Sequence, residues 1–397
     1  MTQNVPATNA SSSLERELDS LLEGQSAAGA KNAVARIEAP AAGFAYEHAV
    51  GVAREDTGEA MTPRHRFHTA SVSKSMTALL VLQLAEEGAL GRAGVDARYV
   101  EFEVFPDEVQ ERLLTRGGRP AFAGVTLRHM LSHTSGFRDA FVDDGSRTSA
   151  DAGGAAPGSI IGSNATRDMT VAWSPWLPDG DAENERGVIN YYLSQPGMSE
   201  ALFEPGAAFH YSDTAFVLLA LLVERVTGES YHANLRNRII EPCGLGDTYL
   251  AYRDDPPLGP RRQPESDVHA RGTAVLSSGG NLSFDWGGGG LVTTAGDLVR
   301  FLRALMGLKL YGSNRTLRDM TAWQQPPGLA PRRTGVGLGL FRTGYTAGDL
   351  WGHSGAWGAK MDHDPAAGIY FAGTVNRTDA ATGWHHALIA TVAEHIR

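Results

Sequence analysis

The stretch HTASVSKSMTALLVLQLAEEG, residues 68–88, places a hydroxyl and an amine at the start of an apolar segment. Residues 76–85 are apolar on nearly every side of a helix, which predicts a helix inside the protein. Ser71 and Lys74 are three residues apart and therefore share one helix face. The pair is either a helix cap beside a solvated lysine or a nucleophile with its base. A base must be neutral, and we expect burial to lower the pKa of Lys74.

Strands are predicted at both ends of the chain and helices between them. The predicted strands are 32–39, 43–54, 336–342, 350–355, 358–364 and 368–376. The predicted helices are 14–22, 76–85, a short one within 125–137, one within 215–230 that ends at Gly228, one within 286–307, and 384–396. This order predicts an α/β (α+β) fold, in which an antiparallel sheet from both chain ends is flanked by helices and carries an inserted helical region.

The same order divides the chain into two predicted domains. Residues 1–80 and 285–397 would form the sheet domain, and residues 81–284 the mainly helical one. Active sites commonly lie where two such parts meet. Between them, residues 138–200 form a long segment that we expect to lie over the active site, because long loops in compact chains are more often functional than idle.

Composition narrows the class of partner and compartment. The formal net charge is −10 without a basic run, which argues against nucleic acid and anionic membranes as partners. The single cysteine, Cys243, allows no internal disulfide and is expected to be a small buried residue. The N-terminus has no apolar secretory core, and no window is long enough to span a membrane, so a cytoplasmic location is predicted.

Five ordered segments resemble the serine β-lactamase and penicillin-binding-protein superfamily. The opening stretch resembles its Ser-x-x-Lys motif and is most similar to the class C branch, with its D-aminopeptidases, DD-carboxypeptidases and esterases. The other four segments, in chain order, are LRHMLSHTSGF, FHYSDTAFVLLALLVERVTGESY, GGGGLVTTAGDLVRF and WGHSGAWGAKM. The resemblance runs from about residue 30 to the C-terminus and implies a β-lactamase/transpeptidase-like fold.

The resemblance also implies catalytic roles. Ser71 would attack an acyl carbon, and Lys74 would accept or relay its proton. Tyr211 would protonate the leaving group and then activate the second nucleophile, with a pKa lowered by nearby ammonium groups. The backbone N–H of Ser71 and one from the 355–357 segment would form an oxyanion hole. Each of these side chains alone would more often be structural, and their order along the chain favours function.

Two positions depart from the family pattern. Asp213 stands where many members have asparagine, and it would hold Lys74 charged, bind a substrate amine, or accept nearby backbone donors. His353 replaces the usual lysine of the third motif, which weakens a fixed positive charge. Ser354, Gly355 and Trp357 follow it and are expected beside the substrate. The long segment adds Trp173 and Trp176, which are either substrate walls or core residues.

Two enzymatic functions are open on this basis. One is a serine hydrolase that cuts an amide or ester of a small molecule or short, possibly D-configured peptide; the other is an acyltransferase that passes the acyl group from Ser71 to an amine or alcohol. A non-catalytic sensor would be expected to have lost part of the triad. A metallohydrolase is disfavoured, because the sequence has no His-x-His spacing. We expect no metal and no cofactor, and the sequence leaves the oligomeric state unknown.

Overall fold

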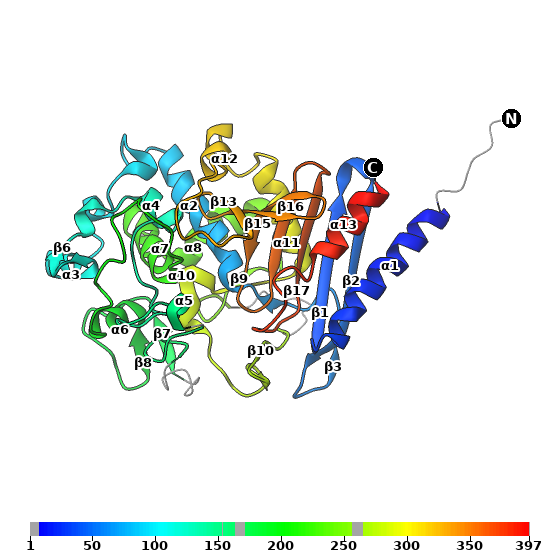
Figure 1. The fold of residues 1–397 in the computed structure, drawn as a ribbon, viewed down its shortest axis with the longest axis horizontal. Helices are drawn as coiled ribbons and strands as arrows, with labels where there is room; N and C mark the ends of the chain where they lie inside the picture. Colours follow the sequence, from blue (N-terminus) through cyan, green and yellow to red (C-terminus); the bar gives the residue numbers. More distant parts are fainter. Residues whose placement is uncertain (1–7, 153, 163–170, 256–264, 397) are drawn as a thin grey trace.

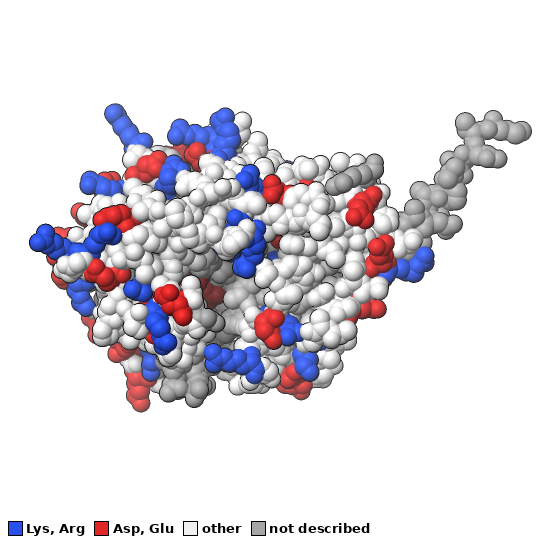
Figure 2. Space-filling view, viewed as in Figure 1, with Lys and Arg blue, Asp and Glu red and all other residues white. Residues whose placement is uncertain are grey.

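The computed structural model describes residues 8–152, 154–162, 171–255 and 265–396. In the view of Figure 1, a sheet stands on the right and most helices gather on the left. Acidic and basic side chains are interspersed over this face, and Figure 2 shows a hollow between the helical part and the sheet. Within the described segments, no helix is long and apolar enough to cross a membrane.

An eight-stranded antiparallel sheet joins the two ends of the chain, as predicted. Its order is β13-β14-β15-β16-β17-β1-β2-β3, so the N-terminal strand β1 lies between the C-terminal β17 and β2. The strands are β1 Asn32–Ala39, β2 Phe44–Arg54, β3 Glu59–Ala60, β13 Arg333–Val336, β14 Phe341–Tyr345, β15 Gly348–Ser354, β16 Lys360–Asp364 and β17 Ile369–Thr374.

The predicted N-terminal hairpin is confirmed. β1 and β2 pair in antiparallel register, with Val34 opposite Ala49. A single turn, Pro40–Ala42, connects them, and Gly43 ends it at φ 66°. That left-handed conformation favours glycine, because it has no Cβ to clash with the backbone.

The predicted strand at 336–342 is wrong, and two strands joined by a turn replace it. β13 ends at Val336 and β14 begins at Phe341, while the N–H of Gly337 donates to the carbonyl of Leu340. Gly339 has φ 74°, and a Cβ there would overlap the Cβ of Ala78 on α2 (Lys74–Glu86). Alternating glycine and apolar residues imitate a strand, but these glycines let the turn rest directly on a helix.

Helices cover both faces of the sheet. α1 (Thr8–Ala27) and α13 (His386–His395) pack side by side on one face, and α11 (Ala295–Met306) packs on the other (Figure 1). Successive side chains of β1 point to opposite faces of the sheet. Val34 packs in the large central core, and Ala35 packs in the cluster under α1 and α13. The first helix is longer than predicted and passes through Gly24, because one glycine costs a helix only about 1 kcal/mol.

The inserted region is built around two buried helices, α2 and α7. As predicted, α7 ends at Gly228, which has φ 72°. The helices outside the sheet layer are α2 Lys74–Glu86, α3 Asp107–Leu113, α4 Leu127–Leu131, α5 Ser149–Ala152, α6 Val188–Ser194, α7 Asp213–Thr227, α8 Tyr231–Leu235, α9 Glu241–Cys243, α10 Trp286–Gly289 and α12 Asn314–Met320. The remaining strands are β4 Phe67–His68, β5 Thr115–Arg116, β6 Arg119–Pro120, β7 Ala172–Ser174, β8 Glu185–Gly187, β9 Tyr249–Leu250, β10 His269–Ala270, β11 Thr273–Ala274 and β12 Leu291–Thr293.

The segment 138–200 carries short elements of its own, α5, β7, β8 and α6, and its residues 153 and 163–170 lie outside the described residues. Trp173 is 3% exposed and belongs to the core, which is the second of the two alternatives given for it. Trp176 packs edge-on against Phe105, with ring centroids 4.7 Å apart. The division into domains 1–80 with 285–397 and 81–284, and the position of the segment over the site, stay predictions.

Candidate active site

Ser71 lies in a tight turn between a strand and a helix. β4 leads into a 3-10 helix, Ala70–Ser73, which runs directly into α2 at Lys74. Ala70, immediately before Ser71, has φ 45°, a conformation that costs a residue with a Cβ of order 1–3 kcal/mol and clusters at functional sites. The end of β15 presses on this turn, since a Cβ on Gly355 would overlap the carbonyl oxygen of Thr69. The turn and the strand end therefore hold each other in place.

Lys74 is fully buried and uses all three of its N–H donors. It donates to the hydroxyl of Ser71 at 3.0 Å and to the carbonyl of Gly288 at 2.6 Å, and it forms an ion pair with Asp213. Burial alone lowers the pKa of Lys74, but the negative charge of Asp213, with smaller contributions from Tyr211 and Asp285, outweighs burial and raises it. The expected lowering is therefore wrong, and Lys74 is an ammonium in this state.

Asp213 occupies the first turn of α7, which Ser212 caps by accepting a hydrogen bond from the N–H of Ala215. Of the three roles considered for Asp213, its contact with Lys74 favours the one in which it holds that lysine charged.

Two further buried carboxyl groups, Asp139 and Asp285, surround this pair, and the sequence analysis missed both. Oδ1 of Asp213, Oδ1 of Asp285 and Nζ of Lys74 all lie within 3.5 Å of the point where a Cβ on Gly288 would be. Burial, reinforced by Asp213, raises the pKa of Asp285 to about 8, although Lys74 opposes it. Burial also raises the pKa of Asp139, again with Asp213 adding to the effect. Asp285 is therefore mostly protonated at pH 7, beside the ion pair of Lys74 and Asp213.

Tyr211 lies beside Lys74. The ammonium of Lys74 lies 5.1 Å from the centre of its ring, and the ring stacks on His133 at 4.2 Å. Its hydroxyl is buried beside Ser71 and Lys74, and both contacts act to lower its pKa, although neither has full hydrogen-bond geometry. Burial raises the pKa of Tyr211, and the nearby charge of Lys74 only partly offsets this. The phenol is neutral, contrary to the expected lowering of its pKa.

The third motif lies at the end of β15. His353 faces Tyr211 with ring centroids 6.3 Å apart, and burial, with Lys74 and Arg333 adding to it, strongly lowers its pKa, so the imidazole is neutral. The N–H of Gly355 donates to the carbonyl of Ala359, which leaves the N–H groups of Ala356 and Trp357 as the candidates for an oxyanion hole in that segment. Trp357 is 9% exposed and packs in the core.

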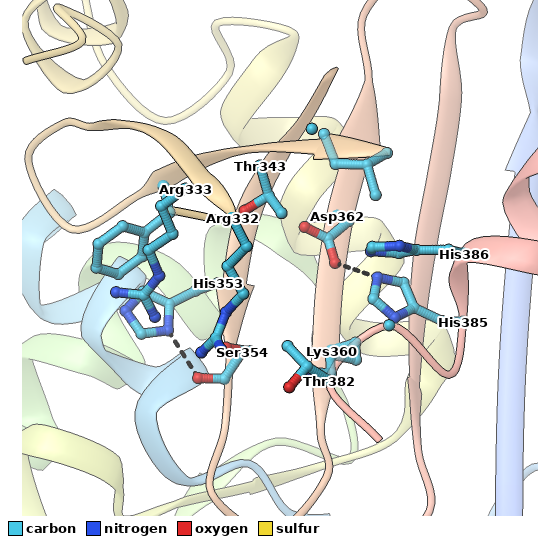
Figure 3. A pocket seen from close by; sticks show the side chains of 15 residues that line it. Arg332, Arg333, Thr343, His353, Ser354, Lys360, Asp362, Thr382, His385 and His386 are labelled. Atoms are coloured by element: carbon cyan, nitrogen blue, oxygen red, sulfur yellow. Dashed lines mark hydrogen bonds and ion pairs between the residues drawn. The ribbon is translucent and has the colours of Figure 1, made fainter. Parts of the chain in front are cut away.

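A cavity of about 230 Å³ opens beside this motif, lined by His353 and Ser354 and by residues of β14, β16 and the segment before α13. Figure 3 shows Arg332 and Arg333 on one side of it and Lys360 on the other. Nε2 of His385 lies 2.8 Å from a carboxylate oxygen of Asp362. The sequence analysis missed Arg333 and Lys360, because their approach depends on a turn and on strand register.

No cluster of three or more His, Cys, Asp or Glu side chains able to hold a metal ion occurs in the described part of the chain. Cys243 is half-buried rather than buried, and burial raises the pKa of its thiol to about 11, so it is not an activated nucleophile.

The chain belongs to the beta-lactamase family, whose model matches residues 18–392. It is 27% identical over 340 residues to esterase EstB of Burkholderia gladioli, covering 81% of this chain and 74% of that protein. It is 28% identical over 211 residues to penicillin-binding protein 4* of Bacillus subtilis, covering 52% of this chain but only 36% of that protein. The fold matches a D-stereospecific amidohydrolase from Streptomyces with a TM-score of 0.69 and 23% identity, covering 92% of this chain and 94% of that one.

Proposed function

We propose that this protein is a serine hydrolase that cuts a small ester or amide through an acyl-enzyme on Ser71. The observation that carries the proposal is the 3.0 Å contact between the Ser71 hydroxyl and the Lys74 ammonium, whose other donors are fixed on Asp213 and Gly288. A serine becomes a nucleophile when a positioned base takes its proton.

The same contacts define a route for that proton. Loss of the proton directed at Asp213 leaves Lys74 neutral with its lone pair towards that carboxyl, and a rotation about the Cε–Nζ bond turns the lone pair to Ser71 while the two remaining N–H groups face Asp213 and Gly288. Lys74 would therefore pass one proton to Asp213 and take another from the Ser71 hydroxyl as its oxygen bonds to the acyl carbon. The N–H of Ser71 and that of Ala356 or Trp357 would bind the oxyanion.

Tyr211 supplies the second proton transfer. Its neutral hydroxyl lies beside Ser71 and Lys74 and can donate to the leaving group. The phenolate formed would take a proton from water in deacylation, and Lys74 would stabilise its charge.

The substrate class follows from the relatives and the size of the site. EstB is an esterase, and the structural neighbour from Streptomyces is a D-stereospecific amidohydrolase, so we extend esters and amides, with a D-configured peptide among them, to this chain. The cytoplasmic location stays a prediction from the sequence.

Intact-protein mass spectrometry tests the proposal. The protein is incubated separately with 4-nitrophenyl acetate, 4-nitrophenyl benzoate and a D-amino acid 4-nitroanilide. The expected result is an acyl adduct on Ser71 that is absent from Ser71→Ala. Turnover that persists in Ser71→Ala would end the proposal. Repeating the reaction with an added amine separates the alternative, because an acyltransferase would form the amide product in preference to the free acid.

A further inference from the structure

The segment LSHTSGF, residues 131–137, is one of the five that resemble the superfamily, yet none of its residues takes part in the proposed proton transfers. Its His133 lies against the stretch that leads to Tyr211, and the carbonyl of His133 accepts the N–H of His210 at 2.9 Å. Residues 209–212 belong to no helix or strand. The place of the tyrosine is therefore set by such individual contacts rather than by a ladder of backbone hydrogen bonds.

His133 contacts Tyr211 and the residue on either side of it. Its ring stacks on the phenol ring, with centroids 4.2 Å apart and the two planes inclined by 24°. Its Nδ1 accepts the N–H of Ser212 at 3.1 Å, while its carbonyl accepts that of His210. One residue thus holds the ring of the tyrosine and the backbone before and after it.

The backbone and the surroundings of His133 keep its ring in this place. Its φ of 57° lies in the left-handed region, where histidine is found more often than most residues that have a Cβ. Its side chain is 1% exposed and packs among Phe209, Phe216 and Phe341 as well as Tyr211. Close-packed aromatic neighbours restrict the ring, so the position of Nδ1 is fixed.

The hydrogen bond from Ser212 also defines the tautomer of His133. An Nδ1 that accepts an N–H carries no proton, so the neutral ring has its proton on Nε2. Burial strongly lowers the pKa of His133, and the charge of Lys74 adds to the effect, so the imidazole is neutral. Nε2 makes no hydrogen bond with the described residues. A phenylalanine would avoid burying that N–H, but it would leave the N–H of Ser212 without an acceptor.

We propose that His133 is a positioning residue for Tyr211, which holds the phenol hydroxyl beside Ser71 and Lys74 where it can protonate the leaving group. This inference rests on the proposed hydrolase, in which Tyr211 donates that proton. His133 acts through the tyrosine and forms no bond with the substrate. Proton transfer needs hydrogen-bond reach, and a displacement of about 1 Å can cost about 100-fold in rate.

A double-mutant cycle on two acetate esters tests this. 4-Nitrophenyl acetate and 4-methoxyphenyl acetate form the same acyl-enzyme, but only the second has a basic leaving group that needs a proton. His133→Phe keeps an aromatic ring and removes the acceptor. It should lower kcat/KM roughly 10- to 100-fold for 4-methoxyphenyl acetate and at most about threefold for 4-nitrophenyl acetate. In a Tyr211→Phe protein the same substitution should cost at most about twofold on either ester, because no hydroxyl is left to position.

The outcomes separate this inference from the proposed function. Losses that multiply in the double variant, while turnover still depends on Ser71 and Tyr211, would overturn the positioning role and leave the hydrolase intact. Equal losses on the two esters in His133→Phe would do the same. Absence of Ser71-dependent turnover would instead remove the hydrolase.

His133→Asn covers a His133→Phe protein that fails to fold. Asparagine tolerates the left-handed backbone, and its Oδ1 can accept the N–H of Ser212 in place of Nδ1. This variant should keep kcat/KM on 4-methoxyphenyl acetate within about fivefold of the wild type, and its loss should disappear when Tyr211 is also replaced by phenylalanine. A loss that persists in that background would overturn the proposal.

His363→Phe is the matched control. His363 is another buried histidine stacked on a tyrosine, with its ring centroid 4.4 Å from that of Tyr370, but it lies on β16. This variant should leave the ratio of kcat/KM on the two esters unchanged. A change in that ratio as large as the one in His133→Phe would show that the effect is not specific to the tyrosine of the site, and would overturn the proposal.

Discussion

Two buried lysines, Lys74 and Lys360, lie near the third motif, and their pKa values are shifted in opposite directions. Lys74 is surrounded by acids, and its pKa is raised despite complete burial. Burial lowers the pKa of Lys360 to about 8, with Arg332 and Arg333 adding to the effect and Asp362 only partly opposing it. Burial penalises both ammonium groups, and only at Lys74 do neighbouring acids outweigh it.

Removing the amine at each position should separate the two roles most strongly. Lys74→Met should lower kcat/KM by about 10²–10⁴-fold on every ester, because it removes the base. Lys360→Met should retain near-normal rates on neutral esters. Steady-state kinetics on one neutral ester compares both variants, and similar losses in both would remove the functional distinction between the two sites.

Tyr211→Phe should cost about 100-fold, since only the proton carried by the hydroxyl is lost and the ring stacked on His133 remains. Kinetics with leaving groups of different basicity checks this. The loss should shrink for 4-nitrophenol, which needs little protonation, and a loss of equal size for poor and good leaving groups would count against Tyr211 as the proton donor.

The two methionine variants should also move stability in opposite directions. Lys74→Met leaves Asp213 buried without its partner and should lower the free energy of unfolding by about 3 kcal/mol. Lys360→Met removes an unpaired buried charge and should raise it at pH 7. The folded pKa of Lys360 lies below its ordinary value, so the native state gains stability as pH rises from about 8 towards 10, and the advantage of Lys360→Met should shrink there. Urea unfolding at pH 7 and 9.5 measures both.

Asp285→Asn should produce the smallest change, a shift in the pH dependence of stability. The folded pKa of Asp285, about 8, lies above its ordinary value, so the native state holds more protons than the unfolded state between about pH 4 and 8, and stability falls as pH rises through that window. Asparagine cannot ionise, so the variant's Tm relative to the wild type should rise by a few degrees between pH 5 and pH 8. Asp179→Asn, at an exposed position, serves as the control. Parallel profiles for wild type and Asp285→Asn would show that Asp285 does not titrate there.

Most of the architecture could be predicted because it is written in local patterns. The Ser71–Lys74 spacing, the hairpin at 32–54 and the glycine stop of α7 depend on residues near one another in the chain. The turn at 337–340 could not be predicted in this way. A glycine is needed at position 339 because the turn packs against Ala78, which is more than two hundred residues away in the chain.

The sequence predicted which catalytic residues come together, but it predicted the wrong direction for the pKa shifts of two of them. Ser71, Lys74 and Tyr211 come together, but the pKa of Lys74 is raised chiefly by Asp213 on α7, with a smaller contribution from Asp285 before α10, and that of Tyr211 is raised by burial. Arg333 and Lys360 have no motif around them. Their convergence follows from the β13–β14 turn and from the register of β16 against β15, which a single sequence does not specify.

The position of β1 between β17 and β2 has a consequence for how the protein is made. On the ribosome, the hairpin of β1 and β2 emerges more than three hundred residues before its other neighbour, so its open edge waits while the rest of the chain is synthesised. Pairing so distant in sequence carries a high contact order and slows folding. Newly made protein is therefore most exposed to aggregation, and most dependent on chaperones, just before the last strand is released.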